Sequence, residues 1–368
     1  MEIITLKYTL VIGFFAATYT LGNSMLPRLI KYFKKNAMMD KPNWRSAHTV
    51  PTPSSGGMSF IFSLFVMLPF VSESNQLLGG VIACFIAGSL GFFDDRYALK
   101  PGLKFVVQFI VASILFLASL KIDNLTGMFG LYAIHPILSY SITIFFVVAI
   151  MNAFNLIDGI DGLAAGIAMI ASLTFGVIFL WHSDFLFSLL AFAFAGSLGA
   201  FLKFNFNPAK IFMGDTGSLA IGVLLAVFFM RTFSHHNLST SAVGFSVLLF
   251  PLTDMARLFI VRIINRKSPF SADKNHYHHL LIKSGDSHKK AAISGYIITI
   301  VHIVIGLIFS SICQITAVFI IISVMSTLMY VFVYLKYFQN ARKNSKIIVE
   351  SINTSTKSNY LLVQHYEK

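Results

Sequence analysis

Charged residues are scarce in this chain. Only 12% of its 368 residues are Asp, Glu, Lys or Arg, the acidic residues number 15 against 28 basic ones, and 56% of the chain is hydrophobic. This is not the composition of a soluble protein. The mean hydropathy of +0.75 indicates that lipid surrounds much of the chain.

Cysteine is almost absent. The two that occur, Cys84 and Cys313, lie within or beside apolar runs, and the chain has no Cys-x-x-Cys pair. This excludes a disulfide framework and a cysteine-based metal site. We interpret both residues as part of the apolar packing.

Long apolar runs are abundant instead. Runs of about 17–25 residues, the length that a bilayer-spanning helix needs, are centred near residues 15, 64, 85, 112, 145, 172, 194, 223, 250, 300 and 324. Because a chain in lipid must satisfy its backbone hydrogen bonds within each segment, we predict an all-α integral membrane protein with about eleven transmembrane helices. The first run lacks a basic start, which is typical of a retained helix rather than a signal peptide. We expect residues 1–337 to form one transmembrane domain and residues 338–368 a flexible basic cytoplasmic tail.

Basic residues are distributed unequally over the loops between these runs. All but three of the 28 Lys and Arg residues fall on one side of the predicted bundle, and the exceptions are Lys7, Lys121 and Arg231. The positive-inside rule therefore predicts an outer N-terminus, cytoplasmic loops after the odd-numbered helices, and a cytoplasmic tail. The same asymmetry explains the net charge of +13 without a nucleic-acid partner.

Five polar loops with unusual composition all fall on this predicted cytoplasmic side. The loops on the other side are short and chemically plain. The chain therefore resembles a scaffold that holds one site at the membrane surface. The five segments are DKPNWRSAHTVPTPSSGG (40–57), GFFDDRYALKPGLKFVVQ (91–108), MNAFNLIDGIDGLAAG (151–166), KFNFNPAKIFMGDTGS (203–218) and NRKSPFSADKNHYHHLLIKSG (265–285).

Carboxylates recur in these loops at predicted helix ends. Asp94 and Asp95 are adjacent, Asp158 and Asp161 lie in a glycine-rich turn, and Asp215 precedes an apolar run. A carboxylate at the bilayer centre costs about 2.5–3.5 kcal/mol, so we expect these groups at the interface. Five converging carboxylates would repel one another unless a cation neutralised them. Hard oxygen ligands without cysteine suit Mg²⁺, or Mn²⁺ in its place.

The loop that follows the ninth run supplies the opposite charge. It carries His276, His278 and His279, with Arg262 close to its start, which are donors suited to a pyrophosphate. Acids that hold a metal and bases that hold phosphate oxygens are the requirements of phosphoryl transfer. The membrane setting indicates a lipid phosphate as one substrate. A zinc site at His-x-His-His is the rival interpretation, but no partner cysteine accompanies it.

Together, in this order, the five segments resemble the polyprenyl-phosphate N-acetylhexosamine-1-phosphate transferases, a family of bacterial membrane enzymes. The motifs that carry this resemblance are DKPNWRSAH…PTPSSGG, GFFDDR, NAFNLIDGIDGLAAG, FMGDTGS and SPFSADKNHYHHLL. The resemblance implies transfer of a sugar-1-phosphate from a UDP-sugar to undecaprenyl phosphate with release of UMP, at the start of cell-surface glycan synthesis. It also implies the bacterial plasma membrane, and it leaves room for a homodimer. The first and last motifs are more similar to the N-acetylglucosamine branch than to the peptidoglycan translocase.

The resemblance also implies roles for individual residues. Asp215 would bind Mg²⁺, and Asp94 and Asp95 would bind metal or activate the lipid phosphate. The remaining candidates are Lys104 for an anion, Asn152, Asn155, Asp158 and Asp161 at the nucleotide end, Phe212 for uracil, His276, His278 and His279 for the pyrophosphate, and Arg45, His48 and Arg262 for phosphate.

Several alternatives stay open on this evidence. The donor could instead carry N-acetylmuramoyl-pentapeptide, or a deoxy sugar such as N-acetylfucosamine. The lipid phosphate could attack the UDP-sugar directly, which we favour because a phosphate monoester is already largely ionised at neutral pH, or an aspartate could first form a covalent intermediate. A secondary transporter is the alternative from another class, but transporters bind ions near the membrane midplane.

Overall fold

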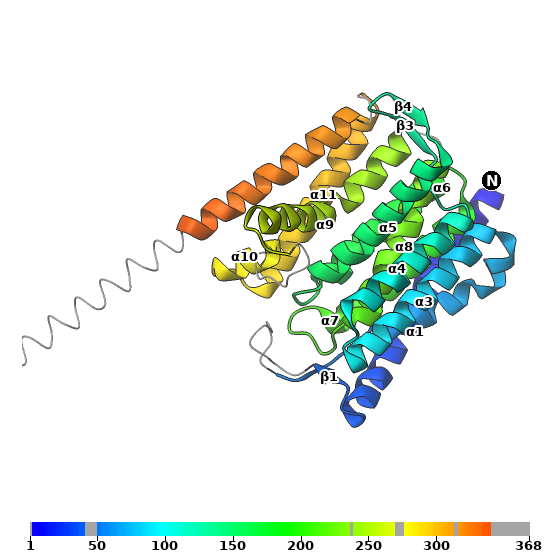
Figure 1. Cartoon of the computed structure of the whole chain (residues 1–368). Coiled ribbons are helices and arrows are strands. Elements are labelled where there is room, and N and C mark those ends of the chain that lie inside the picture. The colour runs from blue at the N-terminus through cyan, green and yellow to red at the C-terminus, as the bar shows by residue number, and fades with distance from the viewer. Residues whose placement is uncertain (1, 41–49, 236–237, 269–275, 313–315, 340–368) are drawn as a thin grey trace, which may run out of the picture.

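The computed structural model describes residues 2–40, 50–235, 238–268, 276–312 and 316–339 of the chain. These residues form a bundle of long helices with two short pairs of antiparallel strands (Figure 1). The helices are α1 (Glu2–Lys35), α2 (Met58–Leu64), the 3-10 helix η1 (Phe65–Glu73), α3 (Asn75–Tyr97), α4 (Pro101–Leu117), α5 (Pro136–Ile157), α6 (Leu163–Trp181), α7 (Phe185–Asn205), α8 (Gly214–Ser234), α9 (Leu238–Ile264), α10 (Tyr277–Lys283), α11 (His288–Ser310) and a last helix, Thr316–Gln339. The strands are β1 (Met39–Asp40), β2 (Thr52–Pro53), β3 (Asn124–Met128) and β4 (Leu131–Ala133).

Helix α8 forms the centre of the bundle. It packs against α3 and α5 and also contacts α2, α6 and α9, so nearly all its side chains are buried. Outside this group, α7 packs against α1 and α6, and α11 covers α9. The centre of the protein is therefore a single apolar helix enclosed by others.

Small residues allow α8 to approach its neighbours closely. A Cβ atom on Gly222 of α8 would lie 2.5 Å from the Cα atom of Met151 on α5. One on Gly91 of α3 would lie 2.3 Å from the backbone carbonyl of Asp215. Small residues at helix contacts are the usual means of tight packing in lipid. Here they also bring the acidic ends of α3 and α8 together.

The polar loops meet at one end of the bundle. Helices α1, α3, α5, α7 and α9 end there, and α2, α4, α6, α8 and α11 begin there. Strands β1 and β2 and helix α10 lie at this end, whereas the β3–β4 hairpin lies at the other (Figure 1). The prediction that the five loops share one face is therefore confirmed for their described residues.

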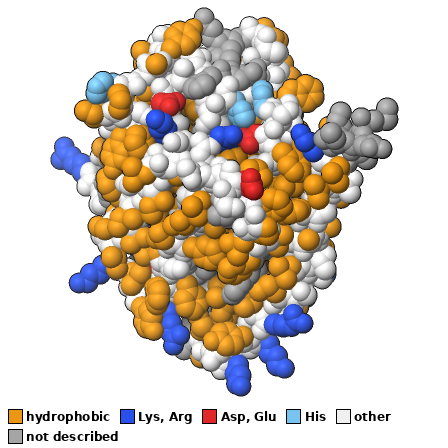
Figure 2. Space-filling view, turned by 90° about the vertical axis from the view of Figure 1, so that its right-hand side faces the viewer, with side chains coloured by type: hydrophobic (Ala, Val, Ile, Leu, Met, Phe, Trp, Pro, Cys, Tyr) orange, Lys and Arg blue, Asp and Glu red, His pale blue; other side chains and the backbone are white. Residues whose placement is uncertain are grey.

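Eight of the described helices are long and apolar enough to cross a membrane: α1, α3, α5, α6, α7, α8, α11 and Thr316–Gln339. Figure 2 shows hydrophobic side chains covering most of one face, with Lys and Arg mainly toward its edges. The prediction of an all-α polytopic membrane protein is confirmed. The count of eleven stays a prediction, because the second span is divided between α2 and η1, the fourth is the 17-residue α4, and α9 is not among the eight. The predicted tail lies outside the described residues from residue 340 onward.

We expect Gly222→Ala to destabilise the bundle, because the added methyl group would force α5 and α8 apart. Overpacking of this kind costs about 1–3 kcal/mol. The matched control is Gly102→Ala in the first turn of α4, where an added Cβ meets nothing within 4 Å. Thermal unfolding of the purified protein in detergent measures both. An unchanged melting temperature for Gly222→Ala would contradict the close packing of α5 and α8.

Candidate active site

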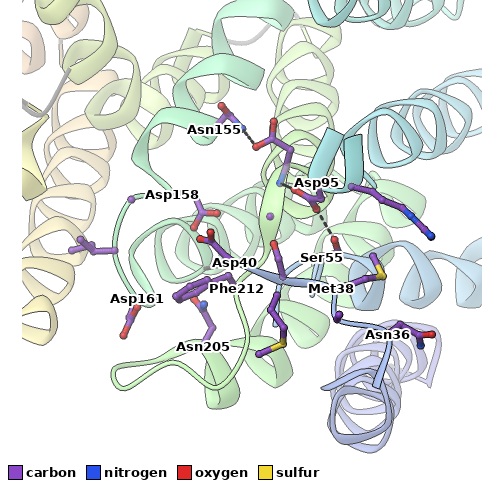
Figure 3. Close-up of a pocket in the computed structure, with 18 of the residues that line it drawn as sticks. Asn36, Met38, Asp40, Ser55, Asp95, Asn155, Asp158, Asp161, Asn205 and Phe212 are labelled. Carbon is purple, nitrogen blue, oxygen red and sulfur yellow. Dashed lines mark hydrogen bonds between the residues drawn. The ribbon is translucent and has the colours of Figure 1, made fainter. Parts of the chain in front are cut away.

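A cavity of about 670 Å³ opens at the end of the bundle where the polar loops meet. Asn155 and Asp95 lie on one side of it, and Asp158, Asp161 and Phe212 lie on the other (Figure 3). Its lining comes from the ends of α1, α3, α5, α7 and α8, from the loops between helices, and from α10. Segments that are far apart in the sequence therefore form one polar site.

A lysine bridges two carboxylates beside this cavity. Lys104 Nζ, in the first turn of α4, lies 2.9 Å from Asp215 Oδ2 at the start of α8 and also binds Asp94 Oδ2 near the end of α3. Asn155 Nδ2 donates to the other oxygen of Asp215, at 2.9 Å, and to Ser218 Oγ. The single positive charge of the ammonium group thus reduces the repulsion between two neighbouring acids.

Asp95, although adjacent to Asp94, makes different contacts. Its carboxylate accepts hydrogen bonds from the backbone N–H groups of Asp215 and Thr216 and from the hydroxyls of Thr216 and Ser55, with distances of 2.7–3.3 Å. It therefore caps the N-terminus of α8 from a neighbouring helix, where a negative charge is favoured by the helix dipole. Asp95 fixes the position of Asp215, whereas Asp94 shares a cation with it.

Asp158 is a cavity carboxylate for which the described part of the chain supplies no partner. It follows α5, lines the cavity, and makes no hydrogen bond or ion pair with any residue the structure describes. Burial, and then the negative charges of Asp215, Asp95 and Asp161, raise its pKa well above the ordinary value. A group in this position is stabilised by a cation or by a hydrogen-bond donor on a ligand.

Asp161 holds the loop between α7 and α8. Its Oδ2 accepts hydrogen bonds from Asn207 Nδ2 at 2.9 Å and from the Ala209 N–H at 3.0 Å. In the same loop, the backbone of Phe212 donates to Pro53 O and accepts from the Gly56 N–H, which places its ring in the lining of the cavity. Asp161 therefore supports the wall that carries Phe212.

The histidines lie on the side of α9 and α10. His276 Nδ1 is 2.9 Å from Asp254 Oδ2, and His279 lines the cavity. His278 is buried, both of its ring nitrogens lack a partner among the described residues, and burial lowers its pKa well below the ordinary value. Its ring packs against Gly159, where a Cβ atom would lie 2.3 Å from His278 Nε2. Burial therefore favours the neutral form of the His278 imidazole, which lies next to the Asp158 turn.

Six of the described residues predicted for the site do not line the cavity: Asp94, Lys104, Asn152, Arg262, His276 and His278. Asn152, one turn before Asn155 on α5, pairs with Gln108 of α4, its Nδ2 donating to Gln108 Oε1 at 2.9 Å. Arg262 is buried in the last turn of α9 with its guanidinium 6.0 Å from the ring of Phe259. Arg45 and His48 lie outside the described residues.

Sequence reasoning missed Asp254, Ser55 and Asn205. Asn205 accepts from the Gly162 N–H and donates to Ile211 O, so it joins the α5–α6 turn to the α7–α8 loop. The signal for Asp254 was present, because an ionisable residue inside an apolar run is rarely without a role. Nothing in the sequence pattern distinguishes Ser55 or Asn205 from their polar neighbours.

The donor set fits a hard divalent cation. Among the described residues, no three His, Cys, Asp or Glu side chains are grouped as a self-sufficient metal site. Mg²⁺ does not need one, because it usually binds one or two carboxylates together with substrate phosphate and water. Asp215 and Asp94 supply such oxygens. Asp158 also lines the cavity, and none of the described residues pairs its carboxylate with a positive charge.

Fold and site together define a polytopic membrane enzyme with an acidic, lysine-bridged site at one end of its helices. Residues 77–233 match the family model described as Glycosyl transferase family 4. The chain is 32% identical over 285 residues to the Bacillus subtilis protein named "Probable undecaprenyl-phosphate N-acetylglucosaminyl 1-phosphate transferase", covering 75% of this chain and 78% of that protein. It is 32% identical to the Mycolicibacterium smegmatis "Decaprenyl-phosphate N-acetylglucosaminephosphotransferase", covering 70% and 71% of the two chains.

A third relative, the Escherichia coli O157:H7 "Undecaprenyl-phosphate alpha-N-acetylglucosaminyl 1-phosphate transferase", is 29% identical over 71% of this chain and 73% of its own length. The chain belongs to this family of polyprenyl-phosphate N-acetylglucosamine-1-phosphate transferases, within glycosyl transferase family 4. The resemblance stated on the five sequence motifs is confirmed.

We expect Asp158→Asn to stabilise the protein above neutral pH when metal and substrate are absent. A raised pKa means that the carboxyl contributes its stability below the ordinary value and loses it as pH rises through the raised one. The uncharged amide avoids that loss. The gain in melting temperature over the parent protein should therefore shrink as pH falls toward about 4, the ordinary pKa of aspartate.

The control is Asp123→Asn, at the opposite end of the bundle, where the carboxylate is 42% exposed beside Lys121. It should show no such pH-dependent gain. The measurement is thermal unfolding in detergent with a chelator, over a series of pH values. A destabilised Asp158→Asn protein at every pH would mean that this carboxylate has a partner.

Proposed function

We propose that this protein transfers N-acetylglucosamine-1-phosphate from UDP-N-acetylglucosamine to undecaprenyl phosphate and releases UMP. The observation that carries the proposal is the Lys104 bridge between Asp94 and Asp215 beside a polar cavity at one end of a membrane-embedded bundle. A charged donor needs such a polar cavity, and a lipid acceptor needs the membrane. The names of the relatives supply the identity of the sugar and of the carrier.

The reaction requires little acid–base chemistry. An oxygen of the lipid phosphate attacks the β-phosphorus of the UDP-sugar, forming a new P–O bond. The bond from that phosphorus to the oxygen bridging the two phosphates breaks, and UMP leaves with the electron pair. Because the attacking phosphate is already largely ionised near neutral pH, catalysis depends on positioning and charge neutralisation.

The hydrogen bonds at the two adjacent acids support direct attack over a covalent aspartyl intermediate. Asp95 accepts three hydrogen bonds from the start of α8 and one from Ser55, and Asp94 accepts from the Leu99 N–H and from Lys104. A nucleophilic carboxylate would have to give up such contacts before it could attack. In this proposal, Asp94 and Lys104 instead orient the lipid phosphate, and Asp95 keeps α8 in place.

The cofactor in this proposal is Mg²⁺, with Mn²⁺ as a substitute, held by Asp215 and Asp94. When bound, it would neutralise the diphosphate oxygens of the donor. Asp158 would lie at the same group of charges, where its unpartnered carboxylate gains a positive neighbour. Asn155 keeps one oxygen of Asp215 oriented through its 2.9 Å hydrogen bond.

In this proposal, the rest of the cavity lining forms the nucleotide end of the site. Phe212 offers a ring on which uracil would stack, and Asp161 holds the loop that carries it. His279 would reach the pyrophosphate from the opposite wall, with His276 and His278 behind it. Further phosphate contacts are proposed for the basic residues Arg45 and His48, but not for Arg262, which is buried outside the cavity lining.

We also propose that the site faces the cytoplasm of a bacterial cell, in the plasma membrane. The basic residues of the chain favour that side by the positive-inside rule, and UDP-sugars are made in the cytoplasm. A transporter would carry its ionisable residues near the membrane midplane. Here the carboxylates of the cavity lie at helix ends, which favours an enzyme at the membrane surface.

The donor is tested by incubating the purified protein with undecaprenyl phosphate, Mg²⁺ and a set of UDP-sugars, with UMP release as the readout. We expect turnover with UDP-N-acetylglucosamine, and none with UDP-N-acetylmuramoyl-pentapeptide or UDP-N-acetylfucosamine. A chelator should abolish UMP release, and added Mg²⁺ or Mn²⁺ should restore it. Turnover with only another donor would contradict the proposed sugar. Activity in the presence of a chelator would exclude a metal ion from the mechanism.

We expect Asp215→Asn to lower turnover by roughly 10²- to 10³-fold, the range for loss of one charge-stabilising group in a transition state, while the variant still binds lipid phosphate. The amide keeps the shape of the side chain but cannot balance the charge of Lys104. Asp123→Asn, at the far end of the bundle, serves as the matched control and should keep full activity. Unchanged turnover of Asp215→Asn would exclude this residue from the mechanism.

A further inference from the structure

Asp254 is a buried carboxylate inside α9. Its side chain is 1% exposed, and it lies ten residues before the end of the helix at Ile264, about 15 Å at 1.5 Å per residue. An ionised carboxylate at such a place is costly unless it is paired and hydrogen-bonded. Its partners therefore indicate what it is retained for.

The two oxygens of Asp254 hold the beginning of α10. Oδ2 lies 2.9 Å from His276 Nδ1, and Oδ1 accepts the Tyr277 N–H at 3.1 Å. His276 is the residue that caps α10, with φ −59° and ψ 153°, and its ring is only 5% exposed. Arg257, one turn further along α9, lies 3.4 Å from Oδ1 and supplies a nearby positive charge. One side chain thus fixes both the backbone and the ring at the start of the histidine segment.

This arrangement selects one tautomer of His276. An ionised carboxylate can only accept hydrogen bonds, so the ring must carry a proton on Nδ1. In that tautomer, Nε2 carries a lone pair and can accept a hydrogen bond but cannot donate one. A carboxylate that orients a histidine in this way is the usual third member of acid–base and metal sites.

The oriented ring is in contact with the rest of the site. His276 stacks on His278, with ring centroids 5.7 Å apart and an angle of 11° between the planes. His278 packs against Gly159 in the Asp158 turn, and His279, which lines the cavity, has its ring centroid 4.3 Å from that of His278. A rotation of His276 would therefore disturb the rings of His278 and His279 as well.

We propose that Asp254 is a positioning residue of the transferase, which holds His276 with its proton on Nδ1 and so keeps the neighbouring rings of His278 and His279 in place, the latter in the cavity lining. The inference rests on the proposed function for the reaction that the cavity carries out. The hydrogen bonds themselves do not depend on it. Asp254 acts through His276 and does not line the cavity.

Asp254→Asn tests this role without a large change in shape. The amide can accept the Tyr277 N–H through its oxygen and donate to His276 Nδ1 through its NH₂ group, which reverses the tautomer of His276. We expect turnover to fall about 10- to 100-fold, the range for loss of a group that orients a histidine. The matched control is Asp184→Asn, which removes another largely buried carboxylate, paired with Arg231 at the far end of the bundle. That variant should keep its turnover.

Histidine tautomers are read directly by NMR of ¹⁵N-histidine-labelled protein, with the His276 signals assigned from a His276→Gln sample. The parent protein and Asp184→Asn should show the Nδ1-protonated ring, and Asp254→Asn the Nε2-protonated ring. The proposal is overturned if the neutral His276 ring of the parent protein carries its proton on Nε2. Because this readout needs no substrate, it remains decisive if the proposed transferase activity is absent.

A double-mutant comparison separates positioning from general stability. If Asp254 acts through His276, Asp254→Asn should change turnover less than twofold in a His276→Gln background. An equal loss in both backgrounds would assign Asp254 a structural role and overturn the inference. Asp254→Glu keeps the charge and should retain the Nδ1 proton, so it serves as the conservative variant. If the Asn variant does not fold, the tautomer of His276 in the parent protein decides the proposal.

Discussion

The ammonium group of Lys104 lies between the carboxylates of Asp94 and Asp215, and the polar end of the bundle depends on this contact. The three residues come from α4, α3 and α8, so one cation joins three helix ends. At a separation of 4 Å and an effective dielectric constant of about 20, two like charges repel by about 4 kcal/mol. Without a cation between them, the negative charges at the ends of α3 and α8 would oppose the close approach of the two helices.

The other contacts of the site follow from this one. Asp95 is free to cap α8 because its neighbour Asp94 already shares the lysine, and the cap holds Asp215 against the cavity. Asp158 is left without positive charge among the described residues, so the site is only partly neutralised before substrate arrives. In the proposed reaction, a magnesium diphosphate would supply both a cation for the acids and an anion for the basic side of the cavity. The proposed reaction requires that combination.

Much of this organisation could be predicted from the sequence. The apolar runs determine where helices lie, because lipid leaves a chain no other way to satisfy its backbone. The glycine-rich DGIDG turn and the acids at predicted helix ends include four residues that line the cavity: Asp95, Asp158, Asp161 and Asp215. The pattern could not distinguish Asp94 from Asp95, because adjacent residues at a helix end point in different directions and meet different helices. It also missed Asp254, whose partner His276 follows 22 residues later in the chain.

The sequence by itself determined the membrane setting, the common face of the five loops and the family, since these depend on composition, spacing and local motifs. Only the tertiary structure decided which carboxylate is neutralised, which one caps α8 and which one is left without a partner. It likewise decided that Asn152 pairs with Gln108 away from the cavity and that Asp254 orients His276. Charge neutralisation and hydrogen bonding act over about 3 Å, and no periodicity along the chain specifies which helix ends come that close.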